Sequence, residues 1–234
     1  MSDFVPGNVT INSEPTRLRP NVIWRLLKAV LTPFFTCWVR THAVGKQNID
    51  DTQGGLLLLN HQSFLDAPAA GVHLKRPISY LAREELFKVP LVGWILRKTY
   101  TVSVSQTAFR GSSIRNAIDH MHQGFLVGIF PEGERTSGPV KKFKRGFLAL
   151  VRRVDLPIYP VGIVGTDALM PVGSTVIRPG KVTVVYGKPL DEEERKLLVT
   201  GQDDEVLTEM MRKRVADCMT QGGFRPEGQF KVGQ

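Results

Sequence analysis

A histidine and an aspartate stand five residues apart, directly after a run of four leucines. Leu56–Leu59 lead into Asn60 and His61, and Asp66 follows. On a regular helix this spacing puts two side chains about 140° apart, so the pair meets only if the chain turns between them. A carboxylate bonded to one ring nitrogen fixes the tautomer and leaves the other nitrogen free as a general base. We therefore predict a base acting on a hydroxyl or water; the alternative is a satisfied histidine beside a carboxylate that only caps a helix.

A second polar loop follows another apolar run. Residues 130–137 read FPEGERTS and come directly after the run 125–130. Gly133 permits close backbone approach, and the planar guanidinium of Arg135 suits bidentate phosphate binding. In open α/β sheets, ligands bind beyond the carboxyl ends of the strands. We therefore expect this loop and His61 on the same side of a sheet, although Pro-Glu-Gly alone is also typical of an exposed turn.

Alternating apolar runs and helix-like segments predict an α/β fold with a mainly parallel or mixed sheet flanked by helices. Strands are expected at residues 55–59, 78–81, 99–104, 125–130, 158–164 and 182–186. Helices are expected at residues 67–73, 91–97, 112–122, 146–154 and 203–220. The last helix is expected to bury a stripe formed by Val206, Met210, Val215 (or the stem of Arg214) and Cys218.

The most apolar stretch of the chain, residues 22–39, lies near its beginning. Two cations and a proline interrupt it, and its longest apolar-to-neutral run, Ala29–Val39, has only 11 residues. A membrane-spanning helix needs about 20 residues. Trp24 and Trp38 near the two ends favour a helical segment, residues 21–42, that lies in a membrane interface. The alternative is an amphipathic helix packed on the domain itself.

The other divisions follow from composition. Residues 1–20 are polar and predict a flexible leader without a signal peptide. Residues 43–222 form the predicted α/β domain, and residues 223–234 a flexible tail.

The net charge of +9 admits nucleic acid, anionic membranes or phosphorylated substrates as partners. Six of the cations lie in residues 141–153, KKFKRGFLALVRR. This segment fits a solvated helix face, or contact with anionic headgroups, coenzyme A phosphates or an acidic acyl-carrier protein. Nucleic acid is not expected, because no binding motif or stacking platform accompanies the charge.

Several other chemistries lack their sequence signals. The two cysteines, Cys37 and Cys218, fit no metal spacing and predict reduced thiols. His120 and His122 lack Cys or carboxylate companions at ligand spacing, so no metal site is predicted. The chain contains no P-loop, no G-x-G-x-x-G and no G-x-S-x-G nucleophile elbow.

Taken together, the motifs resemble the glycerolipid acyltransferase family (PlsC-like), and most closely its lysophosphatidic acid acyltransferases. Asn60-His61-x-x-x-x-Asp66 matches the first block of that family, and residues 130–137 look like its third. Residues 158–161 are similar to the fourth block, and residues 143–146 resemble a basic segment after the third. The resemblance covers roughly residues 44–186. The second block departs: in residues 99–105, Ser105 stands where the family has an arginine, and Arg110 is the nearest replacement. That block is associated with acceptor binding, so the acceptor stays open.

The resemblance implies an O-acyltransferase that moves a fatty acyl group from acyl-CoA or acyl-carrier protein to the hydroxyl of 1-acylglycerol-3-phosphate, making phosphatidic acid in phospholipid biosynthesis. It implies His61 as the base, Asp66 as the group that orients it, and no metal or cofactor. The interfacial segment, the basic charge and the reduced thiols add the expectation of peripheral or monotopic attachment to an anionic membrane surface on the cytoplasmic side. Two alternatives stay open: the same mechanism on another lysolipid or amphipathic alcohol, and a catalytically silent lipid-binding protein.

The resemblance also implies a set of substrate-binding residues. Arg135 is expected to grip the acceptor phosphate, while Glu132 and Gly133 shape the loop. Arg83 lies where the family often has a basic residue near that phosphate. Backbone N–H groups are expected to stabilise the oxyanion. The expected substrate-binding residues are Asn60, Arg83, Glu132, Gly133, Arg135, Thr136, Lys144 and Arg145.

Overall fold

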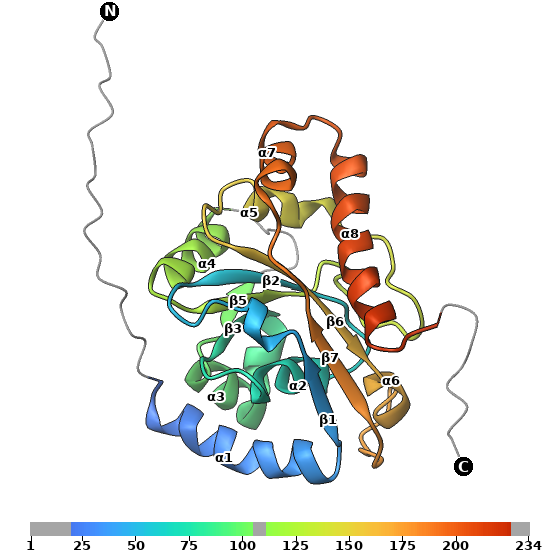
Figure 1. Cartoon of the computed structure of the whole chain (residues 1–234). Coiled ribbons are helices and arrows are strands. Elements are labelled where there is room, and N and C mark those ends of the chain that lie inside the picture. Colours follow the sequence, from blue (N-terminus) through green and yellow to red (C-terminus); the bar gives the residue numbers. More distant parts are fainter. Residues whose placement is uncertain (1–19, 105–110, 226–234) are drawn as a thin grey trace, which may run out of the picture.

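A seven-stranded mixed sheet forms the centre of the protein (Figure 1). The computed structural model describes residues 20–104 and 111–225. The strand order is β1-β7-β6-β2-β5-β3-β4; β6 and β7 pair antiparallel, and the other neighbours pair in parallel. This confirms the expected α/β class. The strands are β1 (Thr41–Val44), β2 (Gly55–Leu59), β3 (Ile78–Arg83), β4 (Val102–Val104), β5 (Leu126–Ile129), β6 (Ile158–Val164) and β7 (Val182–Tyr186).

Helices cover both faces of this sheet. They are α1 (Val22–Cys37), α2 (Asp66–Val72), α3 (Pro90–Lys98), α4 (Ser112–His122), α5 (Leu148–Val151), α6 (Thr166–Leu169), α7 (Glu192–Thr200) and α8 (Asp204–Gln221). Short 3₁₀ turns lie at Lys46–Asn48, Glu84–Lys88 and Arg145–Phe147.

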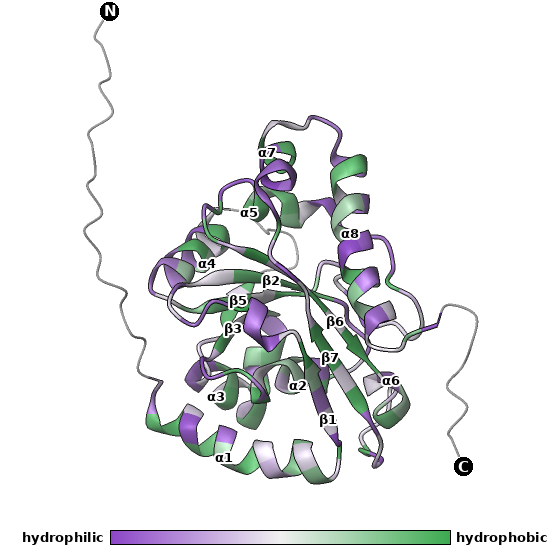
Figure 2. Cartoon of the chain, viewed as in Figure 1, coloured by the Kyte–Doolittle hydropathy of each residue, from purple (hydrophilic) through white to green (hydrophobic). Residues whose placement is uncertain are grey.

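The leucine run of β2 shows how the two layers arise. Successive side chains of a strand point to opposite faces. Leu56 and Leu58 join a core cluster with α4, α5 and α8, whereas Leu57 and Leu59 join a second cluster with α1 and α2. All five residues of β2 are buried, which explains why the strand is apolar throughout rather than alternating. Apolar residues likewise line β6 and β7 (Figure 2).

Several element boundaries differ from those expected. The strand expected at 99–104 begins only at Val102, because α3 runs to Lys98 and Tyr100 adopts a positive φ of 63°. The helix expected at 146–154 is the short α5, entered through a 3₁₀ turn. β1 and α6 were not predicted.

The stripe expected on the last helix is wrong at Val206, which is exposed. The buried stripe starts one residue later, because Asp203 caps the helix and Leu207 is the first residue that faces the core. The buried side chains of α8 are Leu207, Thr208, Met211, Val215, Cys218 and Met219. At Gly162 of β6, a Cβ would lie 2.4 Å from the backbone nitrogen of Met219, so only glycine allows α8 to pack this closely.

The N-terminal helix α1 packs on the domain with one side and is exposed on the other. Its Phe35 is buried in the cluster shared with α2. Asn21 caps the helix by accepting a hydrogen bond from the Trp24 backbone at 2.7 Å. The helix ends at Cys37, and residues 41–42, placed in the interfacial segment by the sequence, belong to the edge strand β1. Within the described ranges, no helix is both long and apolar enough to cross a bilayer.

Candidate active site

The carboxyl ends of four strands meet at one edge of the sheet. Leu58 of β2 lies opposite Ile129 of β5 in parallel register, and Leu59 lies opposite Val161 of β6. β3 lies parallel to β5 on the other side. The predicted loops after β2 and β5 therefore leave the sheet side by side, joined by the end of β3 and the segment after β6.

His61 and Asp66 are in contact, with 2.8 Å between Nδ1 and Oδ2. The chain turns between them, so that Asp66 becomes the first residue of α2 and is fully buried. Its Oδ2 also accepts the backbone N–H groups of Gln62 (2.7 Å) and Ser63 (2.8 Å). A carboxylate held in this way keeps the proton of the neutral imidazole on Nδ1 and leaves the Nε2 lone pair available as a base.

The second oxygen of Asp66 is held by a residue that the sequence did not single out. The hydroxyl of Thr166 donates to Oδ1 at 2.5 Å, and Thr166 is fully buried at the start of α6. A signal was present in the sequence, because Thr166 is a polar residue just beyond the apolar strand 158–164. That strand lies beside β2, and its end therefore faces the same site.

An aromatic stack supports the imidazole ring of His61. The ring of Phe130 lies 4.1 Å away, centroid to centroid, at an interplanar angle of 24°. The ring of Tyr80 also stacks on Phe130, at 5.8 Å between centroids, and its hydroxyl donates to the carbonyl of Ala67 at 2.7 Å. The stack therefore fixes the plane of the His61 ring, while the Asp66 carboxylate fixes its rotation.

Glu132 and Thr136 hold the backbone of His61 from the other loop. The N–H of His61 donates to Oε1 of Glu132 at 2.7 Å, and the N–H of Thr136 donates to the carbonyl of His61 at 2.9 Å. Oε2 of Glu132 accepts from the Thr136 hydroxyl and from the backbone of Lys141. Burial raises the pKa of the Glu132 carboxyl, and these hydrogen bonds act in the opposite direction. Both residues were predicted to bind substrate, but both side chains are buried and engaged within the protein.

Asn60, also predicted to bind substrate, is buried and joins two strands. Its side-chain amide donates to the carbonyl of Ile163 at 2.8 Å and accepts the N–H of Ile163 at 2.7 Å. The amide thus extends the pairing of β2 with β6 by one residue and fixes where the His61 loop begins.

Two of the predicted residues, Arg83 and Lys144, lie beside a third, Gly133, where the loop bends. Arg83 donates to the carbonyl of Gly133 at 2.7 Å. Gly133 has a φ of 72°, and a Cβ there would lie 2.7 Å from Nζ of Lys144. Two exposed cations therefore flank this turn of the loop.

Arg135, two residues further along, lies over an aromatic ring. Its guanidinium carbon is 3.6 Å from the centroid of Phe64, an exposed residue of the His61 loop that the sequence did not single out. No spacing signal connects these two positions; only the meeting of the two loops does.

Three other cations of residues 141–153 pair with carboxylates at the start of α8. Arg145, predicted to bind substrate, lies 3.4 Å from Glu205 of α8, and Lys142 pairs with the same carboxylate. Arg152 pairs with Asp204 at 2.7 Å. The acidic start of α8 therefore neutralises part of the basic segment. Ser105 and Arg110, from the divergent second block, lie outside the described residues.

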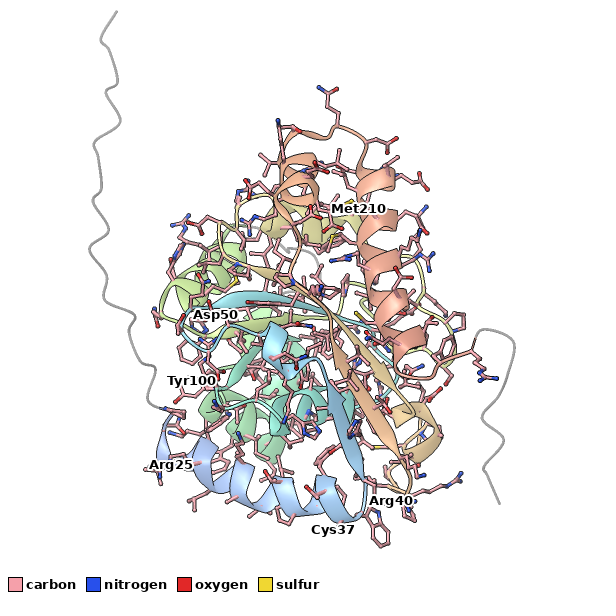
Figure 3. The ribbon with its side chains drawn as sticks, viewed as in Figure 1. Arg25, Cys37, Arg40, Asp50, Tyr100 and Met210 are labelled. Carbon is pink, nitrogen blue, oxygen red and sulfur yellow. The ribbon has the colours of Figure 1, made fainter. Side chains whose placement is uncertain are left out.

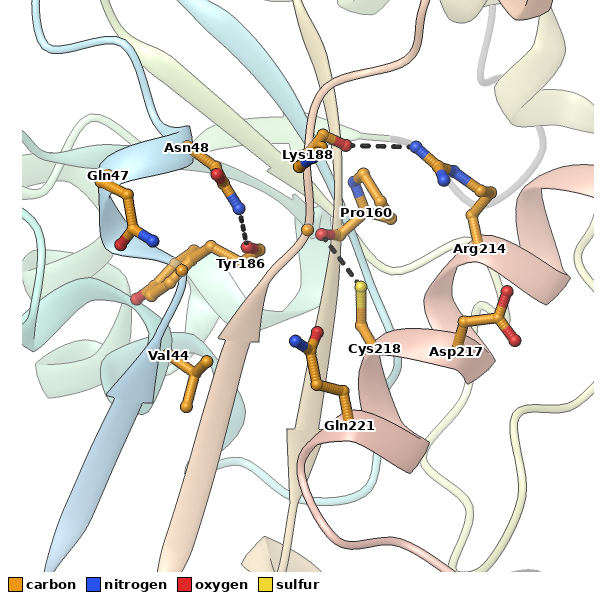
Figure 4. Close-up of a pocket in the computed structure, with 12 residues that line it drawn as sticks. Val44, Gln47, Asn48, Pro160, Tyr186, Lys188, Arg214, Asp217, Cys218 and Gln221 are labelled. Atoms are coloured by element: carbon orange, nitrogen blue, oxygen red, sulfur yellow. Dashed lines mark hydrogen bonds between the residues drawn. The ribbon is translucent and has the colours of Figure 1, made fainter.

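A pocket of about 390 Å³ lies away from these residues, between α8 and the ends of β1 and β7 (Figure 4). Asn48, Tyr186, Arg214 and Cys218 are among its lining residues, and none of the predicted site residues lines it. The candidate site is therefore the open edge beside His61 rather than this pocket.

Comparisons with known proteins agree with this arrangement. The chain is similar to a 1-acyl-sn-glycerol-3-phosphate acyltransferase of Chlamydomonas reinhardtii, at 29% identity over 73% of this chain and 51% of that protein. It is 28% identical to the Bacillus subtilis protein of the same name, over 74% of this chain and 84% of that protein. The chain thus spans about half the length of the first relative and most of the second.

A solved structure is also similar. The crystal structure of the 1-acyl-sn-glycerophosphate (LPA) acyltransferase PlsC from Thermotoga maritima matches with a TM-score of 0.68 and 26% identity, over 86% of this chain and 81% of that one. The family model described as Acyltransferase matches residues 40–164, which include the His61 and Glu132 loops and end with β6. On this evidence the chain belongs to the acyltransferase family.

Proposed function

We propose that this protein is an O-acyltransferase that transfers a fatty acyl group from a thioester donor to the hydroxyl of 1-acylglycerol-3-phosphate, giving phosphatidic acid for phospholipid biosynthesis. The observation that carries the proposal is the contact of His61 with Asp66, at a sheet edge that also carries Arg83, Arg135 and Lys144. Family membership and the names of the relatives support it.

The proposed step begins with the acceptor hydroxyl against Nε2 of His61. The imidazole takes the hydroxyl proton as the oxygen attacks the thioester carbonyl carbon. The tetrahedral intermediate then expels the thiolate. The thiolate receives this proton from the imidazolium, which restores the neutral histidine. Asp66 stabilises the imidazolium between these two transfers, as the carboxylate does in serine hydrolase triads. This direct transfer forms no acyl-enzyme and assigns no role to a metal or cofactor.

The acceptor phosphate fits the cations around Gly133. Arg83 and Lys144 flank the turn and are exposed, and Arg135 offers a planar fork. The buried side chains of Asn60, Glu132 and Thr136 hold the loops around His61. We therefore assign them a positioning role, and leave substrate contact to the three cations and His61. The donor is acyl-CoA or acyl-carrier protein.

Because the acceptor and the product are both lipids, the proposal includes a membrane surface. Exposed apolar side chains on α1 fit attachment to the cytoplasmic face of a membrane, peripheral or monotopic. The anionic phosphate of the acceptor and the net charge of +9 favour an anionic surface.

The test offers labelled acyl-CoA and acyl-carrier protein with a panel of lysolipids. We expect transfer to 1-acylglycerol-3-phosphate, reduced about 10²–10⁴-fold in His61→Ala because a general base is lost. The matched control is His122→Ala, which removes an exposed histidine of α4. Transfer only to acceptors without the phosphate would replace this proposal by the other-lysolipid alternative. No transfer from folded, lipid-binding protein would favour the catalytically silent alternative.

A further inference from the structure

Exposed apolar side chains continue from α1 onto a loop that is distant in sequence. Val22, Leu26 and Val30 recur every four residues on α1 and are 67%, 62% and 70% exposed. Beyond the helix, Trp38 is 47% exposed. The loop of residues 171–181, between α6 and β7, adds Val172 and Val176, at 53% and 64%. Exposed apolar side chains that gather on neighbouring segments mark an interaction site more often than scattered single residues do.

Three hydrogen bonds fasten the 171–181 loop to the end of α1. The indole N–H of Trp38 donates to the carbonyl of Ile177 at 3.1 Å, and the N–H of Gly180 donates to the carbonyl of Trp38 at 3.3 Å. Nε of Arg40 donates to the carbonyl of Gly180 at 3.0 Å. These bonds hold the loop against the end of α1, so the exposed side chains of the two segments lie on neighbouring parts of the molecule.

The charges on this surface are all of one sign. The sequence has no Asp or Glu from residue 21 to residue 49, and none from residue 168 to residue 190. Four exposed cations flank the apolar side chains: Arg25, Arg40, Arg178 and Lys181. Arg25 and Arg40 lie toward the two ends of α1 at the edge of the molecule (Figure 3). Apolar side chains among cations, with a tryptophan at the junction, match the boundary of an anionic bilayer.

We propose that the 171–181 loop and α1 together form a docking face for an anionic phospholipid bilayer, with the loop as a second lipid-contacting element. The docking face consists of Val22, Arg25, Leu26, Val30, Trp38, Arg40, Val172, Val176, Arg178 and Lys181. This deepens the proposed function and rests on it for the choice of a lipid surface, because α1 alone was expected to make that contact.

The same loop connects the bilayer with the candidate active site. Thr166, at the start of the preceding helix α6, holds Asp66, and the carbonyl of Met170 accepts the hydroxyl of Ser63 at 2.8 Å. The chain enters the 171–181 loop at the next residue. Docking of the loop therefore fixes the height of the His61 loop above the lipid surface.

The experiment measures sedimentation of the full chain with vesicles, without acyl donor or acceptor. Vesicles of phosphatidylcholine alone are compared with vesicles that contain phosphatidylglycerol. We expect Val172→Asp/Val176→Asp to lower the partition coefficient on anionic vesicles at least about tenfold. The matched control, Leu197→Asp/Val199→Asp, adds the same charge at two exposed apolar residues of α7 and should stay within about twofold of wild type. Far-ultraviolet circular dichroism and the melting temperature check folding.

A second pair of variants tests the charges. Arg178→Gln/Lys181→Gln should lower binding to anionic vesicles about fivefold per cation removed and leave binding to neutral vesicles unchanged. Its control, Lys196→Gln/Lys213→Gln, changes two exposed lysines of α7 and α8 and should bind like wild type.

Equal losses in the loop variants and their controls would overturn the proposal, as would wild-type vesicle binding by both loop variants. A loop variant that binds vesicles normally but loses self-association in size-exclusion chromatography would replace the bilayer by a second copy of the chain. Because the assay contains no substrate, a failure of acyl transfer leaves its result unaffected, and the two proposals can fail separately.

Discussion

Thr166 binds the one oxygen of Asp66 that does not face His61. The Thr166 hydroxyl donates to Oδ1 at 2.5 Å. Oδ2 accepts hydrogen bonds from Nδ1–H of His61 and from two backbone N–H groups. The buried carboxylate is thus fixed at both ends, and the segment that follows β6 takes part in orienting the base. Thr166 is therefore a positioning residue, which acts on His61 through Asp66.

Replacing Thr166 by valine keeps the shape of the side chain and removes the donor. A hydrogen bond to a charged group contributes about 1.5–3 kcal/mol, so we expect kcat to fall about 10–100-fold. The KM for the acceptor should change little, because Thr166 does not lie among the cations around Gly133. Steady-state kinetics of Thr166→Val and Thr166→Ser test this expectation. Serine retains a hydroxyl and should restore most of kcat; equal losses in both variants would argue for a packing role instead.

The positions of the two polar loops could be predicted from the sequence, because both follow apolar runs that form neighbouring parallel strands. Residue type was a weaker guide to role. Glu132 has the chemistry of a site residue, yet its carboxylate turns inward onto the His61 backbone. The contact of Phe64 with Arg135 depends on how two loops meet in space, and no periodicity encodes it. β1 was missed because four residues, THAV, provide too short a pattern to recognise.

Phe64 is expected to hold the guanidinium of Arg135 in place for the acceptor phosphate. A cation–π contact at an exposed site contributes about 0.5–1 kcal/mol, so Phe64→Leu should raise the acceptor KM about two- to fivefold. Phe64→Tyr keeps the aromatic face and is the matched control. In an Arg135→Ala background the Phe64→Leu change should have no further effect on KM, because its partner is gone. Additive effects in this double-mutant cycle would show that Phe64 acts independently of Arg135.

The two thiols should react at very different rates. Cys37 is exposed at the end of α1, whereas Cys218 is buried beneath β6, and burial raises the pKa of its thiol to about 11. At pH 8 only about 0.1% of such a thiol is thiolate, the reactive form. Titration with a disulfide reagent at pH 8 should therefore show one fast thiol, which disappears in Cys37→Ser. The second should react only after denaturant is added. Two fast thiols in the folded protein would contradict the burial of Cys218.

His73 should make the fold less stable in mild acid. Burial lowers the pKa of this histidine below its usual 6.5, and repulsion from Lys46, His42 and Lys28 adds to the shift. The unfolded chain then binds more protons than the folded protein as pH falls below 6.5, so the free energy of unfolding decreases there. The contribution is fully present above pH 6.5 and is lost as pH falls through the lower, folded-state pKa. Urea unfolding at pH 7.5 and pH 5.5 should therefore show a smaller decrease in His73→Gln than in wild type. Equal decreases in the two proteins would mean that His73 takes up its proton as readily in the fold as in the unfolded chain.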